Sequence, residues 1–118
     1  MLFMGIDVGT QGVRCVVADV RGGIAAAASK SFASVNIARE AGWIEQSPED
    51  WREAVETVVR DCIAQLRAAG VDPARIQAIS IDGTSGTIVP LDERNRPLSN
   101  GVMYNDPGAG AEAAIVHA

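Results

Sequence analysis

The sequence contains few of the side chains that build disulfide frameworks and zinc sites. Its 118 residues include two cysteines, Cys15 and Cys62, and one histidine, His117. Two cysteines so far apart in the chain are too few for a disulfide framework or a zinc cluster. We therefore expect both to be small core residues of a protein in a reducing compartment, and we assign His117 no role.

The sequence also lacks long apolar runs, a signal peptide and an excess of basic charge. No apolar run approaches the roughly 18 residues that a membrane span needs, and the chain enters a predicted strand without a basic leader and cleavage site. Fifteen acidic residues against ten basic ones give a net charge of −5, which argues against a nucleic-acid-binding face. We expect a cytoplasmic protein with no membrane and no nucleic-acid partner.

A glycine-rich turn between two apolar runs organises the N-terminal part of the chain. The runs, residues 2–6 and 13–18, predict a β-hairpin. Amides of the turn can form a concavity for an anion, and the carboxylate at the end of the first strand suits a hydrated magnesium ion. The turn is a candidate cradle for magnesium and nucleotide phosphate, and glycines that serve only the hairpin are the alternative. The residues concerned are Asp7, Gly9, Thr10, Gln11 and Gly12.

The pattern along the chain predicts an α/β fold with a mixed sheet. Hydrophobic residues make up 47% of the sequence, which is enough for the core of one domain. The predicted order is a meander of three strands, then a helix, then two further strands. The long helix between two strands implies a crossover that places the next strand parallel to its neighbour in the sheet. The expected sheet has about five strands and one long helix. The strands are predicted at residues 2–7, 13–19, 24–35, 76–81 and 87–91, a surface loop at 36–42 and a second helix at 110–118.

The long helix has the clearest boundaries in the sequence. Ser47 suits the N-cap, Pro48 suits the first helical position, and two acidic residues follow in the first turn. Gly70 and Pro73 are expected to end the helix. Apolar residues at helical spacing predict a stripe that faces the sheet. The stripe consists of Trp51, Val55, Val58, Val59, Cys62 and Leu66.

Four short motifs resemble those of the FGGY family of carbohydrate kinases in order and approximate spacing. They are Gly5-Ile-Asp-Val-Gly-Thr10, Gly42-Trp-Ile-Glu-Gln46 followed by Pro48 and Trp51, Ile81-Asp-Gly-Thr-Ser-Gly-Thr87, and Met103-Tyr-Asn-Asp106. The second motif is the most specific, because no generic structural cause explains it. The resemblance implies a ribonuclease-H-like half-domain of the actin-like ATPase type. It also implies an ATP- and Mg²⁺-dependent kinase of a ketopentose, with D-ribulose ahead of D-xylulose.

The resemblance implies a role for each matching residue. Asp7 corresponds to the acid that works with magnesium near the transferred phosphate, so it is the expected catalytic and metal-binding residue. Gly9, Thr10 and Gln11 correspond to the phosphate loop that binds ATP. The remaining matches are expected to contact the sugar. They are Gly12, Arg14, Gln46, Gly83, Thr84, Ser85 and Asp106.

Structural explanations stay open for the first of these sugar-binding candidates. Arg14 could be a strand residue that points to solvent. Gln46, together with its neighbour Glu45, could belong to a solvated loop before the helix, with Trp43 packed against the core. In that case neither residue would meet a sugar.

The later candidates have structural alternatives as well. Thr84 and Ser85 could bond to their own backbone at a β-bulge, and Asp82 could only orient the loop that follows it. Asp106 lies in a turn-prone Asn-Asp-Pro-Gly sequence. The family usually has Arg where Gly108 stands, so the resemblance leaves substrate affinity and identity open.

The length of the chain is the largest departure from the family pattern. FGGY kinases have two such domains, and the second supplies the general-base aspartate and most of the adenosine pocket. We therefore expect residues 1–118 to be a partial N-terminal domain without the second domain, and a homodimer of the full-length protein stays open. Two other functions are possible: a nucleotide-dependent conformational module of the actin or Hsp70 type, and a non-catalytic interaction fragment.

These expectations generate a first prediction about activity. The purified 118-residue chain should not phosphorylate D-ribulose or D-xylulose, because the general base and the adenosine pocket are expected outside it. A coupled ADP-release assay against a vector control measures this directly. Sugar-dependent ADP release above that control would contradict the prediction.

Overall fold

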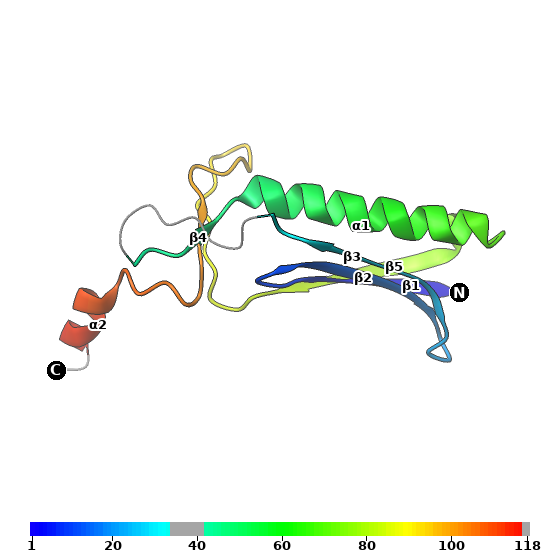
Figure 1. Cartoon of the computed structure of the whole chain (residues 1–118), viewed down its shortest axis with the longest axis horizontal. Coiled ribbons are helices and arrows are strands. Elements are labelled where there is room, and N and C mark those ends of the chain that lie inside the picture. Colours follow the sequence, from blue (N-terminus) through cyan, green and yellow to red (C-terminus); the bar gives the residue numbers. More distant parts are fainter. Residues whose placement is uncertain (34–41, 117–118) are drawn as a thin grey trace. The chain divides into compact units, whose positions relative to one another are not determined.

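The computed structural model describes residues 1–33 and 42–116, and the chain divides into two compact units. The first unit comprises Met1–Ala33 and Glu49–Thr84, and the second comprises Ser34–Pro48 and Ser85–Ala118. The first unit holds the main sheet and the long helix (Figure 1). Nearly all of the loop predicted at residues 36–42 lies outside the described residues.

The main sheet is mixed, as predicted. Its strands are β1 (Leu2–Val8), β2 (Gly12–Asp19), β3 (Ile24–Ser31) and β5 (Ile76–Gly83). The spatial order is β3-β2-β1-β5; β2 is antiparallel to both β1 and β3, and β5 is parallel to β1. Within the described residues this sheet has four strands, and the α/β fold class is confirmed.

The strand predicted at residues 87–91 is wrong. Ile88 and Leu91 make only isolated bridges, to Val102 and Pro97. Pro90 has no N–H to donate to a ladder, and the turn that follows closes tightly. The second unit instead contains a small sheet of β4 (Glu45–Gln46) and β6 (Gly101–Val102), and the short helix α2 (Gly110–Val116) follows where a helix was predicted.

Helix α1 (Pro48–Ala68) begins and ends close to the predicted residues. Gly70 has φ of +70°, a conformation that glycine adopts at low cost. Its amide donates to the Arg67 carbonyl at 3.0 Å, and the Val71 amide donates to the Leu66 carbonyl at 2.9 Å. These two bonds are the Schellman pattern, which satisfies carbonyls at the end of a helix. A short 3₁₀ helix, η1 (Pro73–Arg75), then leads into β5.

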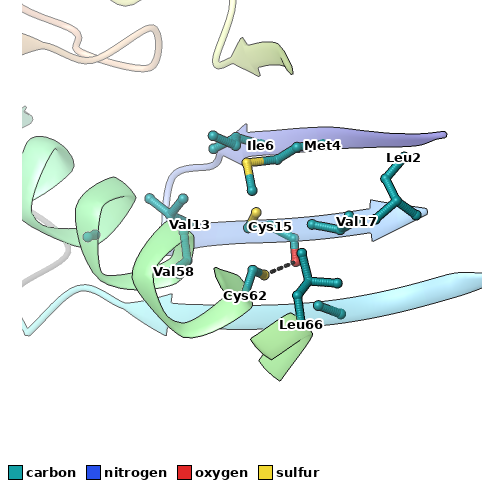
Figure 2. Close-up of a cluster of buried hydrophobic side chains, with 11 residues drawn as sticks. Leu2, Met4, Ile6, Val13, Cys15, Val17, Val58, Cys62 and Leu66 are labelled. Atoms are coloured by element: carbon teal, nitrogen blue, oxygen red, sulfur yellow. Dashed lines mark hydrogen bonds between the residues drawn. The ribbon is translucent and has the colours of Figure 1, made fainter. Parts of the chain in front are cut away.

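The core of the first unit lies between α1 and one face of the sheet (Figure 2). The predicted helix stripe is correct at its centre, whereas Trp51, Val55 and Val59 lie at its margins and Ala54 is an additional buried member. The fully buried or nearly buried members are Leu2, Met4, Ile6, Val13, Cys15, Val17, Ala26, Ala54, Val58, Cys62 and Leu66.

Both cysteines are free and completely buried in this core, as predicted. The Cys62 thiol lies 3.8 Å from the Cys15 carbonyl oxygen and donates to it (Figure 2). Burial raises the pKa of the Cys15 thiol to about 12, so the neutral form packs as a small apolar group.

The outer edge of the sheet is partly closed by a side chain of α1. The Gln65 side-chain nitrogen donates to the Ala27 carbonyl at 2.8 Å, and the Ala27 amide donates to the Gln65 Oε1 at 3.2 Å. Ala27 lies on β3, the edge strand. One amide side chain therefore satisfies both groups that this residue turns away from the ladder.

No helix in the described residues is long and apolar enough to cross a membrane.

Gly12 generates a prediction about stability, because it has no room for a side chain. A Cβ atom on Gly12 would lie 2.3 Å from the Lys30 carbonyl oxygen and 2.8 Å from the Ser31 Cα. Since both neighbours are backbone atoms of β3, Gly12→Ala should force the strands apart and cost about 1–3 kcal/mol, as overpacking does. The urea-unfolding midpoint of the 118-residue chain measures the loss.

Gly5→Ala is the matched control for this substitution. A Cβ atom on Gly5 would meet nothing within 4 Å, so the change should be neutral or stabilising by less than about 1 kcal/mol. Equal unfolding midpoints for the Gly12 and Gly5 variants would contradict the prediction that the close approach of β2 and β3 at Gly12 excludes a side chain there.

Candidate functional site

An ion pair joins the hairpin strands on the face of the sheet that α1 does not cover. Asp7 and Arg14 are directly opposite each other in the β1–β2 register. The Arg14 Nη1 donates to the Asp7 Oδ2 at 3.2 Å. The two side chains are 48% (Asp7) and 70% (Arg14) exposed, so solvent weakens the pair. Arg14 therefore lies on the solvent side of the strand, as the alternative to a sugar contact anticipated.

A cavity of about 340 Å³ opens on the same face, over the middle of the sheet. Asp82, on β5, is the register partner of Asp7 on its other side, so carboxylates from two neighbouring strands face one hollow. Gly5 contributes no side chain, which leaves space between the charged groups and the apolar neighbours. The cavity is lined by Gly5, Ile6, Asp7, Arg14, Val16, Ser80 and Asp82.

Asp82 is the charged residue of this cavity that sequence reasoning left without a site role. The signal was nevertheless present, because alternation along two parallel strands places Asp7 and Asp82 on the same face once their register is known. The register itself depends on the crossover through α1 and could not be counted from the sequence.

The chemistry of this face fits a magnesium ion held largely by water. Magnesium prefers oxygen ligands, keeps several waters and commonly binds one or two carboxylates together with phosphate oxygens. Asp7 and Asp82 supply such carboxylates at the lining of this cavity. Among the described residues no three acidic, cysteine or histidine side chains gather into a closed metal cage. Asp7 could therefore hold the ion from one side only.

The turn after β1 uses part of its own hydrogen-bonding capacity. The Gly9 amide donates to the Gly12 carbonyl at 2.9 Å, and the Phe32 amide donates to the Gln11 carbonyl at 3.0 Å. The Gly9 amide is thus committed within the hairpin, and any phosphate contact there would depend on Thr10 and Gln11. A nucleotide-binding role for the turn stays a prediction.

The end of β5 carries the next group of predicted residues. Gly83 is the register partner of Val8 at the end of the sheet. Thr84, which follows it, is half-buried, and Ser85 is exposed at a turn. Gly86 has φ of +82°, which a glycine adopts without strain. The Ser85 hydroxyl is therefore on the surface, where a ligand can reach it.

Two predicted residues of the second unit are unexpectedly buried. Glu45 and Gln46 are 2% and 3% exposed, and they form the strand β4 that pairs with β6. The Asn100 Nδ2 donates to the Glu45 Oε2 at 3.0 Å. Trp43, in contrast, is 41% exposed. The alternative of a solvated loop with Trp43 packed on the core is wrong, because Glu45 and Gln46 are buried in a strand pair and Trp43 is not.

Asp106, also in the second unit, has a clear structural role. Its carboxylate accepts from the Ile44 amide and, at 2.7 Å, from the Gly108 amide. A Cβ atom on Gly108 would lie 2.6 Å from the Asp106 Oδ1, so a larger residue there would displace this carboxylate. The turn explanation for Asp106 is therefore supported. A carboxylate has further lone pairs, and a sugar contact stays a prediction.

Comparison with known proteins places the chain among sugar kinases. The model of the "FGGY family of carbohydrate kinases, N-terminal domain" matches residues 2–117. A xylulose kinase of Bacillus subtilis is 30% identical over 103 residues, which is 87% of this chain and 20% of that protein. A ribulokinase of Geobacillus thermodenitrificans is 32% identical over 104 residues, which is 80% of this chain and 18% of that protein.

A solved structure agrees in fold with the described chain. The crystal structure of a "xyloylose kinase" from Brucella ovis superposes with a TM-score of 0.85 and 27% sequence identity, covering 98% of this chain and 23% of that one. The chain thus spans about a fifth of the length of the curated relatives it matches. Since the family model covers nearly the whole sequence, the chain belongs to the FGGY family of carbohydrate kinases, as a match to their N-terminal domain.

Proposed function

We propose that the protein containing this chain transfers the γ-phosphoryl group of ATP to a hydroxyl of a ketopentose, with D-ribulose ahead of D-xylulose. The observation that carries the proposal is the position of Asp7 in a chain of the FGGY family. Asp7 lies near the end of β1 and lines the cavity on the face of the sheet that α1 does not cover. Family membership favours a sugar kinase over a conformational module of the actin or Hsp70 type.

The catalytic part of the proposal assigns Asp7 to magnesium and to the phosphate. Phosphoryl transfer needs positioning and charge neutralisation more than covalent chemistry from the protein. Magnesium supplies neutralisation of the phosphate oxygens when it is bound. The Asp7 carboxylate would hold the hydrated ion, and the turn of Gly9, Thr10 and Gln11 would meet the phosphates. The base that takes the sugar proton is expected outside these 118 residues.

The sugar part of the proposal depends on small hydroxyl groups. Ser and Thr hydroxyls both donate and accept, which suits a polyol, and Ser85 is exposed. Gly12, Gln46, Gly83 and Asp106 remain proposed sugar-binding residues. D-ribulose is placed first because the Thr84-Ser85 loop resembles that of ribulokinase-type members. The relatives do not separate the two sugars, since one is a xylulose kinase and another a ribulokinase at similar identity.

A substrate panel tests this function on the full-length protein. ATP-dependent phosphorylation of D-ribulose, D-xylulose and glycerol would be compared by kcat/KM, with and without magnesium. The proposal expects the highest value for D-ribulose and no turnover without a divalent cation. Highest activity on glycerol would reject the ketopentose, and sugar-independent ATP hydrolysis would favour the conformational module.

Asp7→Ala is the first substitution that follows from the proposed function. The charge of Asp7 is needed mainly when the phosphoryl group moves, so the loss should appear in kcat rather than in sugar affinity. By analogy with other single electrostatic stabilisers, kcat should fall on the order of 100-fold or more. Steady-state kinetics of the full-length enzyme with saturating ATP measures the effect.

Asp61→Ala is a matched control, since it removes the same charge from the exposed side of α1. Its kcat should equal that of the wild type. A near-normal kcat for Asp7→Ala, or an equal loss in both variants, would remove the catalytic role of Asp7.

Ser85→Ala tests the proposed sugar contact. A neutral hydrogen bond is worth about 0.5–1.5 kcal/mol net, so KM for D-ribulose should rise roughly 2- to 13-fold. KM for ATP should stay the same and serves as the internal control. The melting temperature should hold as well, because the Ser85 side chain is exposed. A lowered melting temperature with an unchanged sugar KM would identify a structural role instead.

A further inference from the structure

Arg14 occupies a position that the proposed function does not explain. Three charged side chains lie on three neighbouring strands around the cavity: Arg14 on β2, Asp7 on β1 and Asp82 on β5. Asp7 is in the middle, and its Oδ2 accepts from Arg14 at 3.2 Å. The Arg14 guanidinium therefore contacts the carboxylate assigned to magnesium, and the Asp82 carboxylate lines the same cavity.

The turn at Gly9 lies close to both side chains of this ion pair. A Cβ atom built on Gly9 would lie 3.8 Å from the Asp7 Oδ1 and 4.0 Å from the Arg14 Nη1. Asp7 thus turns one oxygen toward Arg14 and the other toward Gly9, at the entrance of the turn. Arg14 contacts the carboxylate in this orientation, and its own Nη1 lies near the same turn.

We propose that Arg14 is a positioning residue that occupies the Asp7 carboxylate in the cation-free state, so that a divalent cation must compete with its guanidinium. The inference depends on the proposed role of Asp7 as the magnesium-binding residue. With a cation bound at Asp7, the guanidinium would leave Oδ2, and Arg14 would become available to an anion at the turn. In either state the Asp7 carboxylate faces a positive charge, which is the guanidinium or the ion.

The exchange predicts that removing Arg14 strengthens cation binding. Exposed ion pairs contribute little, and a nearby positive charge repels a divalent ion through solvent. Arg14→Gln should therefore lower the dissociation constant for Mn²⁺ on the order of two- to ten-fold. A role of Arg14 in packing alone would leave this constant unchanged.

The test is a titration of the 118-residue chain with Mn²⁺, in which electron paramagnetic resonance counts the unbound ion. Arg14→Lys keeps the charge and should bind Mn²⁺ within about two-fold of the wild type. Arg60→Gln removes the same charge from the exposed side of α1 and should change binding less than Arg14→Gln does. Circular dichroism spectra would show that each variant is folded, as expected for exposed side chains.

Asp7→Asn separates the two proposals. If Asp7→Asn weakens Mn²⁺ binding while Arg14→Gln and Arg60→Gln behave alike, only the competition by Arg14 is overturned. If Asp7→Asn binds Mn²⁺ as the wild type does, the metal-binding role of Asp7 fails and the competition fails with it. Tighter binding in Arg14→Gln, together with weaker binding in Asp7→Asn, supports both.

Discussion

The packing of α1 on one face of the sheet is the constraint on which the site depends. Side chains alternate across a strand, so burying Met4 and Ile6 beneath the helix forces Gly5 and Asp7 to the other face. The same alternation turns Arg14 outward when Val13 and Cys15 are buried. A slip of one residue in the register of β1 would bury the Asp7 carboxylate. The core thereby determines which charged groups can reach a ligand.

Strand pairing adds a second constraint at the turn. The backbone of β3 approaches Gly12 so closely that a Cβ atom would lie 2.3 Å from the Lys30 carbonyl oxygen. The glycine that the family resemblance assigns to the sugar thus has a sufficient structural reason of its own. The Gly9 amide is also used within the hairpin, because it donates a hydrogen bond to the Gly12 carbonyl. A ligand at this turn would therefore depend on groups other than the Gly9 amide.

Much of the fold could be predicted from the sequence, because local signals coincide there with tertiary packing. Pro48 and Gly70 bracket α1, and the alternation of β1 and β2 identifies their buried faces. The strand predicted at 87–91 failed because its apolar residues lie next to Pro90 and form only isolated bridges. Burial of Glu45 was not predictable either, since it follows from pairing with β6, more than 50 residues away in the sequence.

The candidate site was predictable only where a residue's role depends on its own strand. Asp7 could be identified from its place at a strand end. Arg14 was a candidate through the family resemblance, but its pairing with Asp7 and the position of Asp82 depend on strand registers that the sequence does not give. In the second unit, Asp106 binds two backbone amides, and the absence of a side chain at Gly108 makes room for that turn. Since an unpaired buried carboxylate is costly, Glu45 with its Asn100 partner is similarly constrained. Ser85, just past the end of β5, is exposed, which is why we propose to test sugar selectivity there.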